Sequence, residues 1–227
     1  MSFGMQFTNG SNQVTLDSEY ARLSVLRTGR FVANGDSGLS STTYFATPIT
    51  SQEPPLVFAR PYASGMPALG RCAILGSAGN WTGFFVRTQS VKYTQPNGEY
   101  FAAAFQATPT ASFGARMWDA AGKLIFDSGT PSALFTRAFQ NWAFEKSVYD
   151  STTTNYFNYY KTLEALPAAN EFLLLNTFGM NMVAGNNPGR LIASIWDFPN
   201  NTLRAVTTST SNPTAFYMPA LFAKKAV

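Results

Sequence analysis

A chain of 227 residues can form one large β domain or two domains of common size. Charged residues make up 12% of it, about half of the roughly 25% expected of a soluble domain, so Ser, Thr, Asn and Gln must supply most of the polar surface. The formal charge of +4 is spread along the chain, and no basic run exceeds Lys224-Lys225, which argues against a nucleic-acid-binding face.

The residue types that most enzymes and metal sites need are scarce. The chain contains no histidine and one cysteine, Cys72, so the common zinc, copper and non-haem iron sites are excluded, as are Ser-His-Asp and Cys-His catalytic arrangements. The apolar neighbours of Cys72 predict that its side chain is buried. We therefore expect no cofactor, no metal and no enzymatic activity.

Nothing in the sequence indicates export or membrane insertion. The first twenty residues show neither the basic start nor the apolar run of a signal peptide, and no window approaches 18 consecutive apolar residues. We expect a chain that is made in the cytoplasm and does not enter a membrane.

The first predicted element is a β-hairpin in GMQFTNGSNQVTLDS, residues 4–18. Apolar residues alternate on both sides of Asn9-Gly10, a dipeptide that favours a tight turn. Asp17 and Ser18 follow the second strand, where a carboxylate and a hydroxyl most simply form a side-chain-stabilised turn that ends the pairing. We prefer this turn to a catalytic or calcium-binding role, because no further acidic residues follow at the spacing of a calcium loop.

Strands are predicted next at intervals near ten residues, separated by Asn, Gly, Pro and Ser. This spacing is typical of a β-sandwich. The expected strands of the first half are residues 23–27, 56–62, 71–76, 84–93 and 99–105.

A second hairpin is predicted after the connector at 106–112. The phrase GARMWDAAGKLIFDS, residues 114–128, repeats the apolar positions of the first phrase at an offset of 110 and ends on Asp127-Ser128 as the first ends on Asp17-Ser18. Its turn uses different residues, Asp119 and Gly122. We expect Asp127 and Ser128 to form the same structural turn.

The second half repeats the strand pattern of the first half. Its expected strands are residues 172–178, 191–196, 204–210 and 216–223, which follow the first-half strands in order when the offset widens to 116–120. The alternative explanation is that the two halves are unrelated and match only because any two β-rich segments share alternating apolar residues. The preserved order favours two tandem, related β-sandwich-like domains, residues 1–111 and 112–227, in an all-β chain.

Aromatic residues gather where the two halves differ most. They lie in what reads as a long polar loop, although 155–166 could also form a helical turn or two that Pro167 would end. Alternating aromatic residues commonly build a core, but an exposed tyrosine cluster would contact protein or stack on sugar. The candidate contact residues are Tyr149, Tyr156, Phe157, Tyr159 and Tyr160.

The hairpin phrase resembles the opening hairpin of small β domains in virion proteins of tailed bacteriophages. The resemblance covers about fifteen residues in each half, and the first copy departs from it with Asn12 where glycine is usual. The matching positions are Gly4, Phe7, Asn9, Val14, Leu16, Asp17 and Ser18, and then Gly114, Met117, Asp119, Leu124, Phe126, Asp127 and Ser128.

The resemblance implies a structural protein of the virion, at a tail tip, baseplate or fibre attachment, assembled in the host cytoplasm. Its implied partners are copies of itself, as a trimer or hexamer, other tail proteins and a host surface, because closed symmetry repeats one interface. The alternative is a receptor- or carbohydrate-binding module that uses an exposed aromatic patch.

Overall fold

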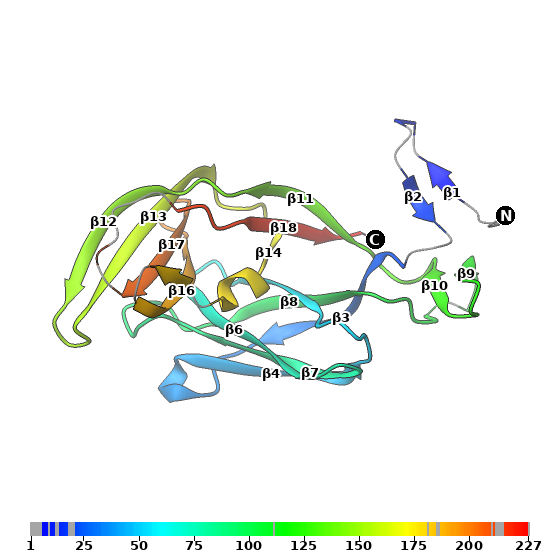
Figure 1. The fold of residues 1–227 in the computed structure, drawn as a ribbon, viewed down its shortest axis with the longest axis horizontal. Coiled ribbons are helices and arrows are strands. Elements are labelled where there is room, and N and C mark those ends of the chain that lie inside the picture. Colours follow the sequence, from blue (N-terminus) through cyan, green and yellow to red (C-terminus); the bar gives the residue numbers. More distant parts are fainter. Residues whose placement is uncertain are drawn as a thin grey trace.

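The protein is all-β, as the sequence predicts. The computed structural model describes residues 6–8, 10–11, 14–17, 21–110, 112–180, 182–184, 187–209, 211 and 216–226. Within these residues the only helical pieces are two short 3₁₀ turns, Asp36–Gly38 and Asn176–Gly179. All other regular secondary structure in these residues is β-strand, and the strands form two large sheets and two separate hairpins (Figure 1).

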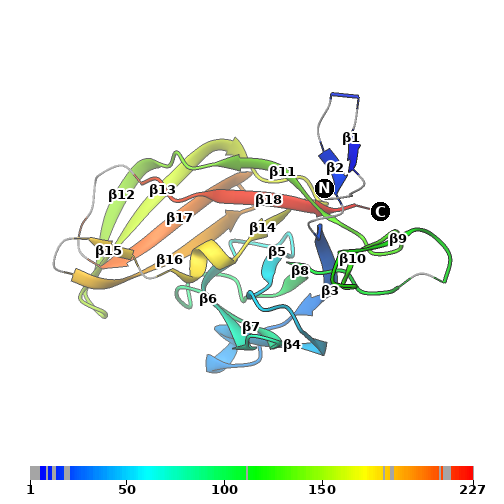
Figure 2. The ribbon, with the colours of Figure 1, turned by 45° about the vertical axis from the view of Figure 1, so that its right-hand side comes forward.

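Both predicted hairpins are confirmed. Each is a two-stranded antiparallel sheet, and the two have the same strand bounds and the same register, including one shift, at an offset of 110 residues. Both lie outside the two large sheets, at the end of the molecule where β18 also ends (Figure 2). Their strands are β1 (Gln6–Thr8) with β2 (Val14–Asp17), and β9 (Arg116–Trp118) with β10 (Leu124–Asp127).

The first large sheet has six strands in the order β11-β18-β14-β5-β8-β3. An isolated bridge joins Ser24 to Ser132, and the Val25 N–H donates a hydrogen bond to the Pro131 carbonyl over 2.8 Å, so the outer strands meet at one end. The strands are β3 (Leu23–Phe31), β5 (Leu56–Pro61), β8 (Gly98–Phe105), β11 (Ala133–Phe139), β14 (Phe172–Leu174) and β18 (Ala220–Lys225).

The second large sheet runs in the order β12-β13-β17-β16-β6-β7-β4, and the short β15 also pairs with β16. Its bounds are β4 (Ser40–Ile49), β6 (Ala68–Ser77), β7 (Asn80–Arg87), β12 (Ala143–Asp150), β13 (Asn155–Ala165), β15 (Met182–Ala184), β16 (Asn187–Asp197) and β17 (Thr202–Ser209).

Each sheet joins strands of both halves of the chain at its centre, through the antiparallel pairs β5–β14 and β6–β16. From these pairs outward, the strand order of one half mirrors that of the other, except that β12 at the edge of the second sheet has no counterpart in the first half. The outer strands β3 and β11 even share a bulge, between Val25 and Arg27 and between Phe135 and Arg137. The division at residue 111 stays a prediction, since the boundary falls between β8 and β9 while both large sheets span it.

Two clusters of buried residues lie between the sheets, as expected of a sandwich, and a third covers the opposite face of the first sheet. On the first-half side, Phe84 of one sheet meets Tyr100 of the other with ring centroids 4.9 Å apart, and the Phe84 side chain is fully buried. On the second-half side, Trp196 and Tyr160 are fully buried with Phe222. Burial of aromatic side chains of this size supplies much of the folding free energy.

Polar side chains also fasten the halves together. The Asn176 side chain accepts a hydrogen bond from the Val57 N–H over 2.8 Å and donates one to the Pro55 carbonyl over 3.0 Å. Because one amide serves two backbone groups of β5 and the loop before it, the 3₁₀ turn after β14 holds the first half in register with the second.

Three sequence expectations need correction. The stretch 84–93, predicted as one strand, ends as a strand at Arg87 and continues as a loop. The stretch 172–178, predicted as one strand, ends as a strand at Leu174 and continues into the 3₁₀ turn. The residues predicted to lie in a long polar loop form instead a regular hairpin, β12–β13, so 155–165 is strand and not a helical turn. Cys72 is buried, as predicted, with 8% of its surface exposed.

Candidate functional site

The aromatic stretch singled out in the sequence is the β12–β13 hairpin, at the opposite end of the molecule from β1–β2 and β9–β10 (Figure 1). Successive residues of a strand point to opposite faces, so the five candidate side chains cannot share one surface. The structure divides them into a pair at the tip, a pair on the outer face and one residue in the core.

Tyr149 and Tyr156 form the pair at the tip. They lie opposite each other in the register, their ring centroids are 5.2 Å apart, and 53% and 36% of their surfaces are exposed. The turn beside them is held by Asp150, which accepts hydrogen bonds from the Thr152 N–H and the Thr153 hydroxyl. The first of these bonds is the main reason that the Asp150 pKa lies below its usual value.

Phe157 and Tyr159 lie on the outer face of the sheet, half-buried against residues of β6, β16 and the loop after β7. The Tyr93 hydroxyl donates a hydrogen bond to the Tyr159 hydroxyl over 3.2 Å, and the Lys146 ammonium sits 5.6 Å from the centre of the Tyr159 ring. Burial raises the pKa of Tyr93, and the hydrogen bond that its hydroxyl donates to Tyr159 adds to the effect. Both side chains, Phe157 and Tyr159, are therefore already packed against other residues of the same chain.

Tyr160 belongs to the core and is fully buried. Its ring packs 4.8 Å from that of Phe216 and 5.8 Å from that of Phe144. It therefore has no surface to offer a partner, and of the five candidates only Tyr149 and Tyr156 are exposed enough to serve as a contact site.

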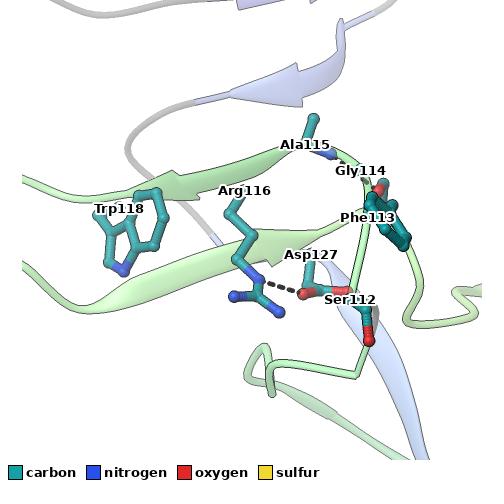
Figure 3. Close-up of a pocket in the computed structure, with 8 residues that line it drawn as sticks. Ser112, Phe113, Gly114, Ala115, Arg116, Trp118 and Asp127 are labelled. Atoms are coloured by element: carbon teal, nitrogen blue, oxygen red, sulfur yellow. Dashed lines mark hydrogen bonds and ion pairs between the residues drawn. The ribbon is translucent and has the colours of Figure 1, made fainter.

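A second feature is the β9–β10 hairpin, for which the sequence predicts a purely structural role. It carries a hollow of 310 Å³ lined by Ser112, Gly114, Arg116 and Asp127, with the rings of Phe113 and Trp118 at its sides (Figure 3). Phe113 is 94% exposed and Trp118 is 54% exposed.

Asp127 holds the base of this hairpin. Its carboxylate accepts hydrogen bonds from the Arg116 guanidinium over 2.7 Å, the Gly129 N–H over 2.9 Å and the Thr110 hydroxyl over 3.0 Å. The Arg116 contact above all lowers the Asp127 pKa from 3.8 to about 2. The Asp127 side chain is only 2% exposed, so it serves the turn and the connector and is closed to a ligand.

Ser128 completes the turn. Its hydroxyl accepts a hydrogen bond from the Ala115 N–H over 3.0 Å. Gly114 adopts φ = +135°, and a Cβ there would lie 2.1 Å from that hydroxyl oxygen, so glycine is needed at the start of the phrase. In the first copy, Ser18 and the side chain of Asp17 lie outside the described residues.

A larger groove of 740 Å³ separates β9–β10 from the first half of the chain. It is lined on one side by Lys123 and Leu124 and on the other by Leu23, Leu56 and the end of β8. Phe105, at that end of β8, is 66% exposed.

Exposed apolar side chains recur along the segment from the end of β8 to the start of β11. Sequence reasoning missed them because it treated the repeated phrase as a folding signal alone. For one of them, Phe113, the signal that could have found it is its place beside the turn glycine Gly114, where no core can enclose it. The residues are Phe105, Phe113, Trp118, Leu134 and Phe135.

Comparison of the chain with models of protein families, with curated proteins and with solved structures finds no match. Among the described residues, no three Cys, Asp or Glu side chains gather as metal ligands. No helix in the described part of the chain is long and apolar enough to span a membrane.

Proposed function

We propose that the protein is a non-enzymatic structural component of a bacteriophage tail, at the tip, baseplate or fibre attachment, that works by symmetric assembly. Its partners are copies of itself, in a trimer or hexamer, and other tail proteins in the virion. In this proposal residues 1–111 and 112–227 are tandem copies of one β unit, which the mirrored strand order of the two sheets supports.

One observation carries the assembly part of the proposal. Phe113, Trp118 and Phe135 are 94%, 54% and 52% exposed, and they lie just before the β9–β10 hairpin, within it and on the strand that follows it. Large exposed aromatic side chains are enriched in protein interfaces, where they bury much area at small entropic cost. Charged residues make up only 12% of the chain, which also favours association because little electrostatic repulsion opposes it.

The tail location rests on the resemblance of the hairpin phrase, and immunogold electron microscopy tests it. Antibody raised against the chain should label purified virions of the encoding phage at the tail tip, baseplate or fibre base. Virions whose tails have been removed serve as the control and should lose the label. Label on capsids alone, or on no virion at all, would refute the tail location.

A second candidate function is recognition of a host receptor or carbohydrate by the tip of β12–β13. Tyr149 and Tyr156 favour it, because two exposed rings 5.2 Å apart form an edge on which a sugar ring can stack. A glycan array should then detect binding that the double variant Tyr149→Ala, Tyr156→Ala abolishes. Tyr44→Ala is the matched control, since Tyr44 is 70% exposed on β4. Equal binding by both variants would exclude the tip.

A further inference from the structure

We infer that two side chains, Asn34 and Arg27, close the edge of β4 and so prevent it from pairing with a strand of a second copy. β4 is the outer strand of the second large sheet (Figure 1). It pairs with β7 on one side and, in the described part of the chain, with no other strand on its other side. A free edge offers backbone N–H and C=O groups to any other strand, and proteins commonly protect such edges.

The sequence of β4 does little to repel a second copy. The strand reads SSTTYFATPI, which contains no charged residue and is rich in Thr and aromatic residues of high strand propensity. Tyr44, near its middle, is 70% exposed. Pro48 has no N–H and interrupts pairing only near the end of the strand. Protection of the remaining edge must therefore come from residues outside β4.

Asn34 closes the first part of the edge. Its side-chain amide donates a hydrogen bond to the Thr42 carbonyl over 2.8 Å, and its side-chain oxygen accepts one from the Thr42 N–H over 2.9 Å. One side chain thus occupies both backbone groups that a paired strand would use at this residue. Gly35 exchanges two backbone hydrogen bonds with Ser40, over 3.1 and 3.2 Å, so the edge is closed at Ser40 as well as at Thr42.

Arg27, on β3, closes the last part of the edge. Its guanidinium donates hydrogen bonds to the Thr47 carbonyl over 2.6 Å and to the Pro48 carbonyl over 3.0 Å. An approaching strand would have to displace this charged group from the edge, and charged side chains are a common protection against strand addition. The backbone around Tyr44 lies between the two closed parts, and it is shorter than a typical strand.

The strand that an open β4 would take is the β4 of a second copy. Every copy presents the same edge, and two identical edges can pair antiparallel about a two-fold axis. An axis at Tyr44 would place two exposed aromatic rings beside each other, and aromatic cross-strand pairs stabilise sheets. Asn34 and Arg27 therefore act as an autoinhibitory contact, which leaves association to other surfaces of the protein.

Opening the edge tests the inference. The double variant Asn34→Ala, Arg27→Ala removes both closures, and light scattering compares its mass with that of the parent chain over the same concentrations. The matched control is Asn170→Ala, Arg30→Ala, because both of these residues are exposed and Arg30 lies on β3 close to Arg27. Circular dichroism checks that each variant is folded, and Asn34→Ala alone replaces the double variant if that one is not.

We expect the opened variant to form, as its concentration rises, a species of about twice the parent's mass, because a two-fold contact pairs two copies. The control should keep the parent's mass. Adding Tyr44→Lys to the opened variant should restore the parent's mass, since two ammonium groups would meet at the axis.

Two results would overturn the inference. One is a folded opened variant that keeps the parent's mass at every concentration, and the other is association that persists when Tyr44→Lys is added. The comparison is made with the parent chain, whether that chain is a monomer or an oligomer. The proposed self-assembly can therefore fail without the closed edge, and the closed edge without the self-assembly.

Discussion

Replacing Tyr160 with alanine tests whether this side chain belongs to the protein core or to a contact surface. Its side chain is fully buried and its ring packs against those of Phe216 and Phe144, at 4.8 and 5.8 Å. Truncating a buried aromatic residue costs about 3–5 kcal/mol, which includes the cavity left behind. For a chain of this length each kcal/mol lowers the melting temperature by roughly 2–4 °C, so we expect Tyr160→Ala to melt about 6–20 °C below the parent.

Circular dichroism during thermal and urea unfolding measures this loss. The matched variant is Tyr149→Ala, because Tyr149 lies on the neighbouring strand but is 53% exposed, and its stability should stay within about 0.5 kcal/mol of the parent. If Tyr160→Ala left stability unchanged while it abolished assembly or ligand binding, Tyr160 would be a contact residue and the inward orientation of β13 would be wrong.

Three further predictions follow from single side chains. Asp127, whose pKa is lowered to about 2, contributes stability above pH 4 that is lost as the pH falls from about 4 to 2; Asp127→Asn should lack this acid-dependent step in an NMR titration of the β9–β10 hairpin. Cys72 should resist a thiol reagent at pH 7 and react fully in urea, and rapid labelling of the folded chain would contradict its burial. Asn176→Ala should cost about 1–3 kcal/mol in urea unfolding, because the Val57 N–H and the Pro55 carbonyl lose their partner; Thr152→Ala at the exposed tip is its control.

The hairpins and the offset between them could be predicted from the sequence because their cause is local. Alternating apolar residues, a turn signal and a terminal Asp-Ser act within fifteen residues, and the register of β9–β10 repeats that of β1–β2. The same local chemistry identified Asp127 and Ser128 as turn residues, where the structure places them.

The missed strands are those whose side chains do not alternate simply between core and solvent. β4 is rich in Ser and Thr and contains Pro48, and it is an edge strand, where proline is tolerated. β11 exposes Leu134, Phe135 and Thr136 in succession, so no period-two pattern marks it. Such strands are fixed by their neighbours, and a single sequence does not show which strands will be neighbours.

The same dependence on strand pairing explains why the candidate contact residues could be predicted only in part. Five aromatic residues in one stretch suggested one surface, yet β13 sends Tyr160 into the core and Tyr159 to the opposite face. Only pairing with β12 brings Tyr149 beside Tyr156. The exposure of Phe113 and Trp118 depends on β9–β10 standing outside both large sheets, which the repeat alone does not indicate.

Multi-angle light scattering on the purified full-length chain, over a wide concentration range, tests symmetric self-assembly most directly. The account predicts one discrete species at three or six times the chain mass of 24.7 kDa, which shifts toward smaller species in the variant Phe113→Ser, Trp118→Ser and persists in Tyr44→Ser. A species of 24.7 kDa at every concentration would contradict it.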